Sequence, residues 1–267
     1  MNRRFWIAII VIVVAVGVVI GIANSTKKNS PSHASTAAAS GATAAPASVV
    51  SDISSIPTTT FDTIGEGTSS VLPTSISAPA LTENQKPEIF YEGAEYCPYC
   101  ATERWAMAVA LARFGTFSDL KVTKSSSSDV YPNTNTLSFY GSTYRSQYLA
   151  FNPIEVYTNI PDGAGYTTLQ TPTAQEQALA TKYDTSGGIP FIDFGGKYTI
   201  SGASYNPQTL SGLSWTQIAG SLANPNAATA KGVDGAANTL TAALCKLTDN
   251  NPGTVCDTVI QGIENKL

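Results

Sequence analysis

Two cysteines separated by two residues form the part of the chain best suited to chemistry. They are Cys97 and Cys100, in the sequence Cys97-Pro98-Tyr99-Cys100. Pro98 suits the first position of a helix, where its missing N–H needs no partner, so Cys97 is expected at or next to the N-cap. The free N–H groups and partial positive charge of a helix N-terminus favour a thiolate. The spacing therefore predicts a redox pair in which Cys97 attacks and the more buried Cys100 resolves.

The other two cysteines, Cys245 and Cys256, have three interpretations. A structural disulfide between them would close a loop of about 12 residues and requires an oxidising compartment. A zinc site with Cys97 and Cys100 would lack a second short-spaced pair. A second redox pair could exchange with the first. The motif and the local spacing favour pairing Cys97 with Cys100 and Cys245 with Cys256.

The motif must be positioned by the elements on either side of it. A short strand over residues 88–91 stops at Gly93, and the helix that the motif opens ends at Gly115. Further along, an Ile189-Pro190 step leads into a hairpin that turns at Gly195-Gly196. Other expected elements are a strand at 120–123, extended structure over 136–157, helices at 173–183 and 213–222, and two short helical stretches carrying Cys245 and Cys256.

A strand, a C-x-x-C helix and a later Ile-Pro hairpin resemble thioredoxin-like proteins. The stretch GAEYCPYCATERW, residues 93–105, further resembles an uncharacterised family of membrane-anchored, extracytoplasmic thioredoxin-like proteins, a domain of unknown function. The resemblance implies a cis Pro190 packed against the two cysteines and a backbone of Ile189 that bonds a substrate chain. It also places Pro98 and Tyr99 against the substrate, and it implies no cofactor beyond the cysteine pair.

The chain departs from this pattern in two ways. Ninety residues separate Cys100 from Pro190, so the expected fold is an α/β thioredoxin-like fold with a strand and loop insertion over residues 120–172. Glu95, Glu103 and Arg104 have no assured family role and are expected at the surface. Glu95 is close enough to the motif to oppose thiolate formation.

The N-terminal part of the chain is expected to lie outside the fold. Residues 5–23 are nineteen positions without a charge, which predicts a transmembrane helix, with residues 1–4 on the cytoplasmic side. A cleaved signal peptide is the alternative. Residues 24–48, mostly Ser, Thr, Ala and Pro, predict a flexible stalk, because they cannot bury apolar area. The folded domain is expected over residues 49–267.

Composition limits the function. Charged residues make up 13% of the 267 residues and the net charge is −4, which excludes a general nucleic-acid binder. The single histidine, His33, lies outside the expected domain, which excludes His-based catalysis and His-rich metal sites there.

The resulting hypothesis is a single-pass, membrane-anchored thiol:disulfide oxidoreductase whose domain lies outside the cytoplasm. It would act on cysteines of client proteins together with a redox partner, in the membrane or outside it, and without a metal. Its direction, whether oxidation, reduction or isomerisation, does not follow from Pro98 and Tyr99. The alternative is a non-enzymatic binding or envelope-structural module in which the disulfides are structural.

Overall fold

The computed structural model describes residues 40–184 and 187–267, and a six-stranded sheet lies at the centre of this part. Its strands are β2 (Thr74–Ser75), β3 (Thr82–Glu83), β4 (Lys86–Gly93), β9 (Ala150–Glu155), β12 (Phe191–Phe194) and β13 (Tyr198–Ser201). The order is β2, β13, β12, β4, β3, and β9 also pairs with β4. β9 is parallel to β4, and the other neighbours are antiparallel. The strand that leads into the cysteine motif therefore has partners on both sides.

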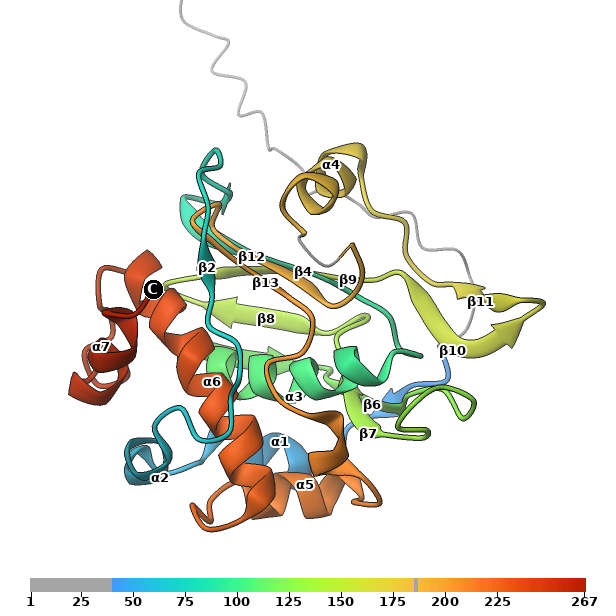
Figure 1. Cartoon of the computed structure of the whole chain (residues 1–267), viewed down its shortest axis with the longest axis horizontal. Coiled ribbons are helices and arrows are strands. Elements are labelled where there is room, and N and C mark those ends of the chain that lie inside the picture. The colour runs from blue at the N-terminus through green and yellow to red at the C-terminus, as the bar shows by residue number, and fades with distance from the viewer. Residues whose placement is uncertain (1–39, 185–186) are drawn as a thin grey trace, which may run out of the picture. The chain divides into compact units, whose positions relative to one another are not determined.

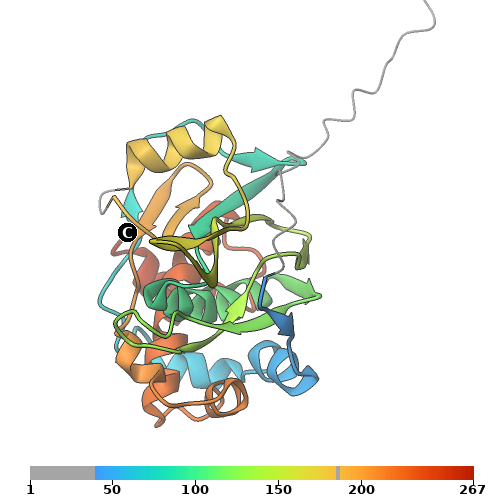
Figure 2. The ribbon, with the colours of Figure 1, turned by 90° about the vertical axis from the view of Figure 1, so that its right-hand side faces the viewer.

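Helices cover both faces of this sheet. α3 (Pro98–Ala112) and α6 (Ala228–Leu247) lie on one face and α4 (Ala174–Tyr183) lies on the other (Figures 1 and 2). Successive side chains of a strand point to opposite faces. Ile89 and Tyr91 of β4 accordingly join the larger core, to which α3 and α6 contribute, whereas Phe90 packs with Ile154 and Phe191 beneath α4.

Smaller helices enclose the face that holds α3 and α6. They are α1 (Ala47–Ser54), α2 (Thr58–Ile64), the 3-10 turn η1 (Pro207–Leu210), α5 (Trp215–Ser221) and α7 (Thr258–Glu264). α1 contacts α3 and α5, while α2 and α7 contact α6. Val49, Ile53 and Phe61 anchor α1 and α2 in the core. As a result, α3 is packed on several sides, and polar residues on this helix are buried.

Three small sheets complete the described part. One consists of β1 (Thr43–Ala44), β6 (Lys121–Lys124) and β7 (Asn135–Ser138), the second of β5 (Gly115–Ser118) and β8 (Thr143–Ser146), and the third of β10 (Tyr157–Asp162) and β11 (Gly165–Thr168). The β10–β11 hairpin projects from the central sheet (Figure 1).

These sheets correct the expected fold class. The expectation was a thioredoxin-like α/β fold with an insertion over residues 120–172, preceded by a transmembrane helix; the structure is a mixed α/β fold with several sheets. The physical reason is that residues 120–172 are not one appended insertion. They supply β9 to the central sheet and strands to all three small sheets, and so they are part of the main packing.

The expected transmembrane helix gains no support either. No helix within residues 40–184 and 187–267 is long and apolar enough to cross a membrane. The span expected at residues 5–23 lies outside the described residues, as do the expected cytoplasmic residues 1–4 and most of the stalk.

The folded part begins before Val49, where the expected stalk should still continue. Thr43 and Ala44 pair with Val122 and Lys121, and the N–H of Ala45 donates to the carbonyl of Leu120. Small and polar residues bury little apolar area, but their backbone groups can still extend an existing sheet. Residues 40–48 therefore belong to the folded part rather than to a flexible stalk.

Several expected elements are confirmed. The helix expected at 173–183 is α4, whose N-cap Thr173 forms a capping box with Glu176. The hairpin after Pro190 is β12–β13, the helix at 213–222 contains α5, and the strand at 120–123 overlaps β6.

The two short helical stretches expected to carry Cys245 and Cys256 were wrong in the length of the first and in the position of the second. Cys245 lies on α6, which has 20 residues, and Cys256 lies just before α7. Most of the buried residues of α6 are small, so the spacing of large apolar side chains does not reveal its length.

Candidate redox site

Cys97 lies at the junction between β4 and α3. β4 ends at Gly93 and α3 begins at Pro98, so Cys97 is the N-cap, with φ −77° and ψ 123°. Its sulfur accepts a hydrogen bond from the backbone N–H of Cys100 at 3.2 Å. This N–H is one of the donors that a helix start leaves without an intrahelical partner. The end of β4 and the start of α3 thus hold the sulfur of Cys97 against the N-terminus of the helix.

The two cysteines have free thiols in different surroundings. Cys97 is 5% exposed and Cys100 is fully buried. Hydrogen bonds from the Cys100 thiol, and from the backbone N–H groups of Cys100 and Tyr99, together with the charge of Arg104, lower the pKa of Cys97 despite its burial. Burial raises the pKa of Cys100 well above its ordinary value. A thiolate therefore forms more readily on Cys97 than on Cys100.

The Ile189–Pro190 step meets the cysteine motif in space. Its peptide bond is cis, as predicted, and Pro190 is buried. The thiol of Cys97 donates to the carbonyl oxygen of Ile189 with a sulfur–oxygen distance of 3.7 Å. Strand pairing explains this contact between residues far apart in sequence: Phe191 begins β12 opposite Glu92, near the end of β4. The motif follows the end of β4 and the proline precedes the start of β12, so both lie at the same end of these two paired strands.

Glu95, Glu103 and Arg104 are fully buried, which corrects the expectation of surface positions. For Glu103 and Arg104 the reason is that α3 packs against α1, α6, β5, β7 and η1, so few of its side chains can reach solvent. Glu95 lies in the turn before α3, where Ser40 and Ser138 contact it. Buried charged groups require partners, because desolvation penalises the ionised form.

Arg104 finds its partners on the neighbouring strands and in the turn before Cys97. Its Nη1 forms an ion pair with Oε2 of Glu155 at 2.9 Å, and it also donates to the carbonyl of Ala94 at 3.1 Å and to the hydroxyl of Tyr91 at 3.3 Å. Its Nε donates to Oγ1 of Thr136 at 3.4 Å. Sequence reasoning missed Glu155; the available signal was a lone carboxylate at the end of a mostly apolar extended run.

The two buried glutamates on either side of the motif are held by serines. Oε1 of Glu95 accepts from the hydroxyls of Ser40 at 2.6 Å and Ser138 at 2.7 Å. Glu103 accepts from the backbone N–H of Ser204 at 2.8 Å and from its hydroxyl at 2.9 Å. Burial raises the pKa of Glu103 to about 7, and the two bonds from Ser204 oppose that rise.

Tyrosines surround the motif at the surface. Tyr96 stacks on Tyr166 with ring centroids 4.1 Å apart, and Tyr99 makes an edge contact with Tyr131 at 6.1 Å. Tyr99 and Tyr157 are 41% and 40% exposed. Sequence reasoning singled out Tyr99 alone. Tyr96 directly precedes Cys97, and the others come from residues 131–166, where a richness in tyrosine was the available signal.

The comparison with family models places this chain. A model described as a domain of unknown function, DUF929, matches residues 73–164 and 164–246, which is more than half of the chain. The chain belongs to the DUF929 family. No curated protein and no solved structure matches it. The matched range includes Cys97, Cys100, Pro190 and Cys245 but ends before Cys256.

Cys245 and Cys256 form a disulfide, with their Cα atoms 5.7 Å apart. It joins the end of α6 to the segment before α7, and both residues are buried. Because the two sulfurs bond to each other, they are not free to bind zinc together with Cys97 and Cys100. The predicted pairing of Cys245 with Cys256 is confirmed.

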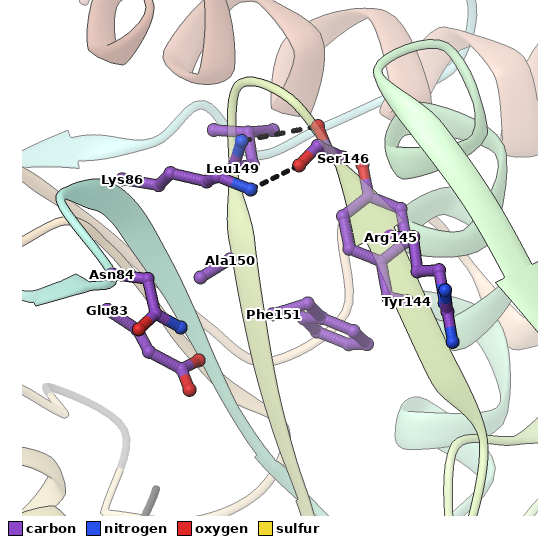
Figure 3. A pocket seen from close by; sticks show the side chains of 9 residues that line it. All are labelled: Glu83, Asn84, Lys86, Tyr144, Arg145, Ser146, Leu149, Ala150 and Phe151. Atoms are coloured by element: carbon purple, nitrogen blue, oxygen red, sulfur yellow. Dashed lines mark hydrogen bonds between the residues drawn. The ribbon is translucent and has the colours of Figure 1, made fainter. Parts of the chain in front are cut away.

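An open cavity of about 270 Å³ lies at the other end of β4 from the motif (Figure 3). The side chain of Lys86 donates to the carbonyl of Ser146 across it. The remaining lining residues are Glu83, Asn84, Tyr144, Arg145, Leu149, Ala150 and Phe151. None of the residues near Cys97 lines this cavity, so it is separate from the candidate redox site.

Proposed function

We propose that this DUF929 chain is a thiol:disulfide oxidoreductase that acts on cysteines of client proteins. Cys97 is the nucleophile and Cys100 the resolving thiol. The observation that carries the proposal is the asymmetry of the pair. The sulfur of Cys97 sits at a helix N-terminus with a lowered pKa, whereas Cys100 is fully buried with a raised pKa. The finer resemblance to thioredoxin-like proteins, which rests on the motif and on Pro190, supports the same proposal.

The chemistry needs only the two sulfurs and a client disulfide. The Cys97 thiolate attacks one client sulfur, the client S–S bond breaks, and the departing client sulfur takes up a proton. Cys100 then loses its proton and attacks the sulfur of Cys97, which breaks the mixed disulfide and forms the Cys97–Cys100 disulfide. The second client sulfur leaves and takes up a proton, so the client is released as a dithiol. Two electrons pass to the client. The reverse sequence oxidises a client dithiol, and the redox partner determines which direction is used.

Ile189, Pro190, Pro98 and Tyr99 form the proposed contact surface for the client chain. Ile189 is half-buried and its carbonyl is next to the sulfur of Cys97, so a client cysteine bonded to Cys97 would lie against it. Tyr99 contributes an exposed ring inside the motif. A rigid ring beside the reacting sulfur gives contact area at a low entropic cost.

The Cys245–Cys256 disulfide supports a location outside the cytoplasm. Disulfides persist in oxidising compartments and are rare where thiols are kept reduced. The clients would then be other proteins of that compartment.

The proposal is tested by trapping. Cys100→Ser should accumulate mixed disulfides with a peptide that carries a disulfide, because the second step is removed, while Cys97→Ser should form none. Non-reducing gels and mass spectrometry measure the adducts. If Cys97→Ser traps as much peptide as Cys100→Ser, or if neither variant traps any, the assignment of roles is wrong.

A non-enzymatic binding module is the second candidate, and the 5% exposure of Cys97 favours it. In that case the Cys97–Cys100 disulfide would be structural and resistant to mild reduction. After mild reduction and treatment with limiting alkylating reagent, an oxidoreductase should be modified at Cys97 alone. A protein that stays unmodified under these conditions would support the binding module.

A further inference from the structure

Arg104 lies on the same face of α3 as Cys100, and the N-cap Cys97 directly precedes that helix. It follows Cys100 by four residues, a spacing that repeats on one face of a helix. Its side chain is fully buried, and its Nη1 contacts the carbonyl of Ala94, in the turn that precedes Cys97. The position places a permanent positive charge beneath the thiol pair.

The surroundings of Arg104 fix that charge in place. Glu155 on β9 pairs with it at 2.9 Å, and Tyr91 on β4 accepts a third bond from the same nitrogen. In the described part of the chain, Nη2 of Arg104 has no hydrogen-bond partner. The titratable groups that surround the thiols and this ion pair are Tyr91, Glu95, Tyr96 and Glu155, with Arg104 as the cation that acts on both sulfurs.

We propose that Arg104, held by Glu155, is a positioning residue that sets the redox balance of the Cys97–Cys100 pair. Its buried charge stabilises a thiolate and therefore the dithiol form relative to the disulfide. The inference rests on the proposed function. The same charge lowers the pKa of Cys97 and opposes the rise at Cys100, while Glu155 partly neutralises it.

Substituting the two members of the Arg104–Glu155 ion pair should shift the stability of the Cys97 thiolate in opposite directions. Arg104→Gln removes the cation, so the Cys97 thiolate should be less stable. Glu155→Gln leaves the cation unneutralised, so the thiolate should be more stable. A purely structural ion pair would weaken the fold in both variants, without opposite effects on the sulfur.

The first experiment follows alkylation of Cys97 against pH in the full chain carrying Cys100→Ser. We expect Arg104→Gln to raise the pKa of Cys97 by about one unit and to slow alkylation at pH 7 by up to about tenfold. Glu155→Gln should lower the pKa, and Arg104→Lys, which keeps the charge, should stay near the parent. Equal pKa values in the parent, Arg104→Gln and Glu155→Gln would overturn the proposal.

The second experiment uses both native cysteines in glutathione buffers at pH 8. Arg104→Gln should shift the pair toward the disulfide by up to about tenfold, which corresponds to about 30 mV, and Glu155→Gln should shift it toward the dithiol. Shifts in the same direction for both variants would also overturn the proposal.

Arg113 provides the matched control. It lies at the C-terminal end of the same helix and bonds Asn238, Thr241 and the carbonyl of Val255. Arg113→Gln removes a charge and buried contacts from α3, but it should leave the pKa of Cys97 unchanged. An equal rise in Arg113→Gln would show that loosening of the helix, not charge, moves the sulfur.

Two further measurements distinguish the charge effect from a failure to fold and from a failure of the proposed function. If Arg104→Gln does not fold, the double variant Arg104→Gln/Glu155→Gln removes the pair as a unit. Its Cys97 pKa should exceed that of Glu155→Gln alone, and equal values would overturn the proposal. Alkylation needs no client, so a wild-type chain that exchanges with no client disulfide would defeat the proposed function while the charge effect at Cys97 could still be measured.

Discussion

Tyr91 depends on a residue two positions further along β4. Its hydroxyl lies 2.1 Å from the position that a Cβ atom on Gly93 would occupy, and its ring is fully buried against Phe139. Only glycine at residue 93 leaves room for this hydroxyl, which accepts a hydrogen bond from Arg104. The glycine that ends the strand therefore also permits the polar contact beneath the thiols.

We predict that Gly93→Ala displaces the Tyr91 hydroxyl from Arg104. Overpacking of this kind costs about 1–3 kcal/mol of unfolding free energy, which urea denaturation would measure. The double variant Gly93→Ala/Tyr91→Phe removes the clashing oxygen and should recover part of the loss. No recovery in the double variant would show that the hydroxyl is not the source of the strain and would leave the ring, whose Cζ atom lies 2.4 Å from the same Cβ position.

At the scale of the elements, the Cys245–Cys256 disulfide fixes the end of α6 to the segment before α7. α6 packs along α3, so the disulfide stabilises the layer that supports the motif. It does so at the end of α6 rather than at the motif itself.

Replacing both Cys245 and Cys256 by Ala should therefore lower stability without abolishing thiol exchange. The closed loop spans 12 residues, since the sequence separation is 11, and the chain-entropy model assigns about 3 kcal/mol to such a loop. Urea unfolding and peptide-disulfide reduction would be compared in the same preparation. Loss of exchange with unchanged stability would instead indicate that the two pairs exchange electrons.

Across the whole described part, several buried carboxyl groups hold protons more strongly than they would in water. Burial raises the pKa of Asp193 to about 6 and that of Asp234 to about 8, each from 3.8, and that of Glu103 to about 7 from 4.5. Between the ordinary and the raised value, the folded state binds more protons than the unfolded chain. Stability is therefore greatest below the ordinary values and falls as pH rises.

We predict that the urea concentration at the unfolding midpoint decreases as the pH is raised from 4.5 to 8. Asp234, on α6, is fully buried and neither of its carboxyl oxygens has a hydrogen-bond partner among the described residues. Asp234→Asn stays neutral at every pH, so it should stabilise the protein at pH 8 by on the order of 2–5 kcal/mol and have little effect at pH 4. A midpoint that rises toward pH 8 in the wild type would contradict this expectation.

The N-terminal limit of the folded part depends on contacts with distant parts of the chain. Residues 40–48 contribute β1 and the Ser40 hydroxyl, which donates a hydrogen bond to Glu95. A chain that starts at residue 40 should be as stable as the full chain in this part, whereas one that starts at residue 49 should lose about 1–3 kcal/mol, because Glu95 loses one of its donors and β6 loses a partner. Thermal unfolding of the two truncated chains would measure the difference.

Alkylation of Cys97 in the same two chains gives a second readout. Loss of Ser40 changes the surroundings of Glu95, two residues before Cys97, so the shorter chain should alkylate at a different rate. Equal stability and equal rates in both chains would show that residues 40–48 are dispensable.

The sequence by itself determined the local parts of the site. Pro98 at a first helical position set the N-cap place of Cys97, Gly195-Gly196 set the hairpin, and the spacing of Cys245 and Cys256 matched their disulfide. Such features depend on backbone preferences within a few residues, so they can be read without knowing what packs nearby.

Only the tertiary structure decided which charges face the sulfurs. Glu155 reaches Arg104 because β9 pairs in parallel with β4, and Ser40 reaches Glu95 as the chain leads into β1, which pairs with β6. Helical periodicity could not distinguish a buried polar position on α3 from an exposed one, because helices and sheets from distant parts of the chain cover most sides of that helix. Burial is set by these long-range contacts, and burial raises the pKa of Cys100 and Glu103, so this part of the electrostatics follows from the fold. The hydrogen bonds that lower the pKa of Cys97 come mainly from the motif itself.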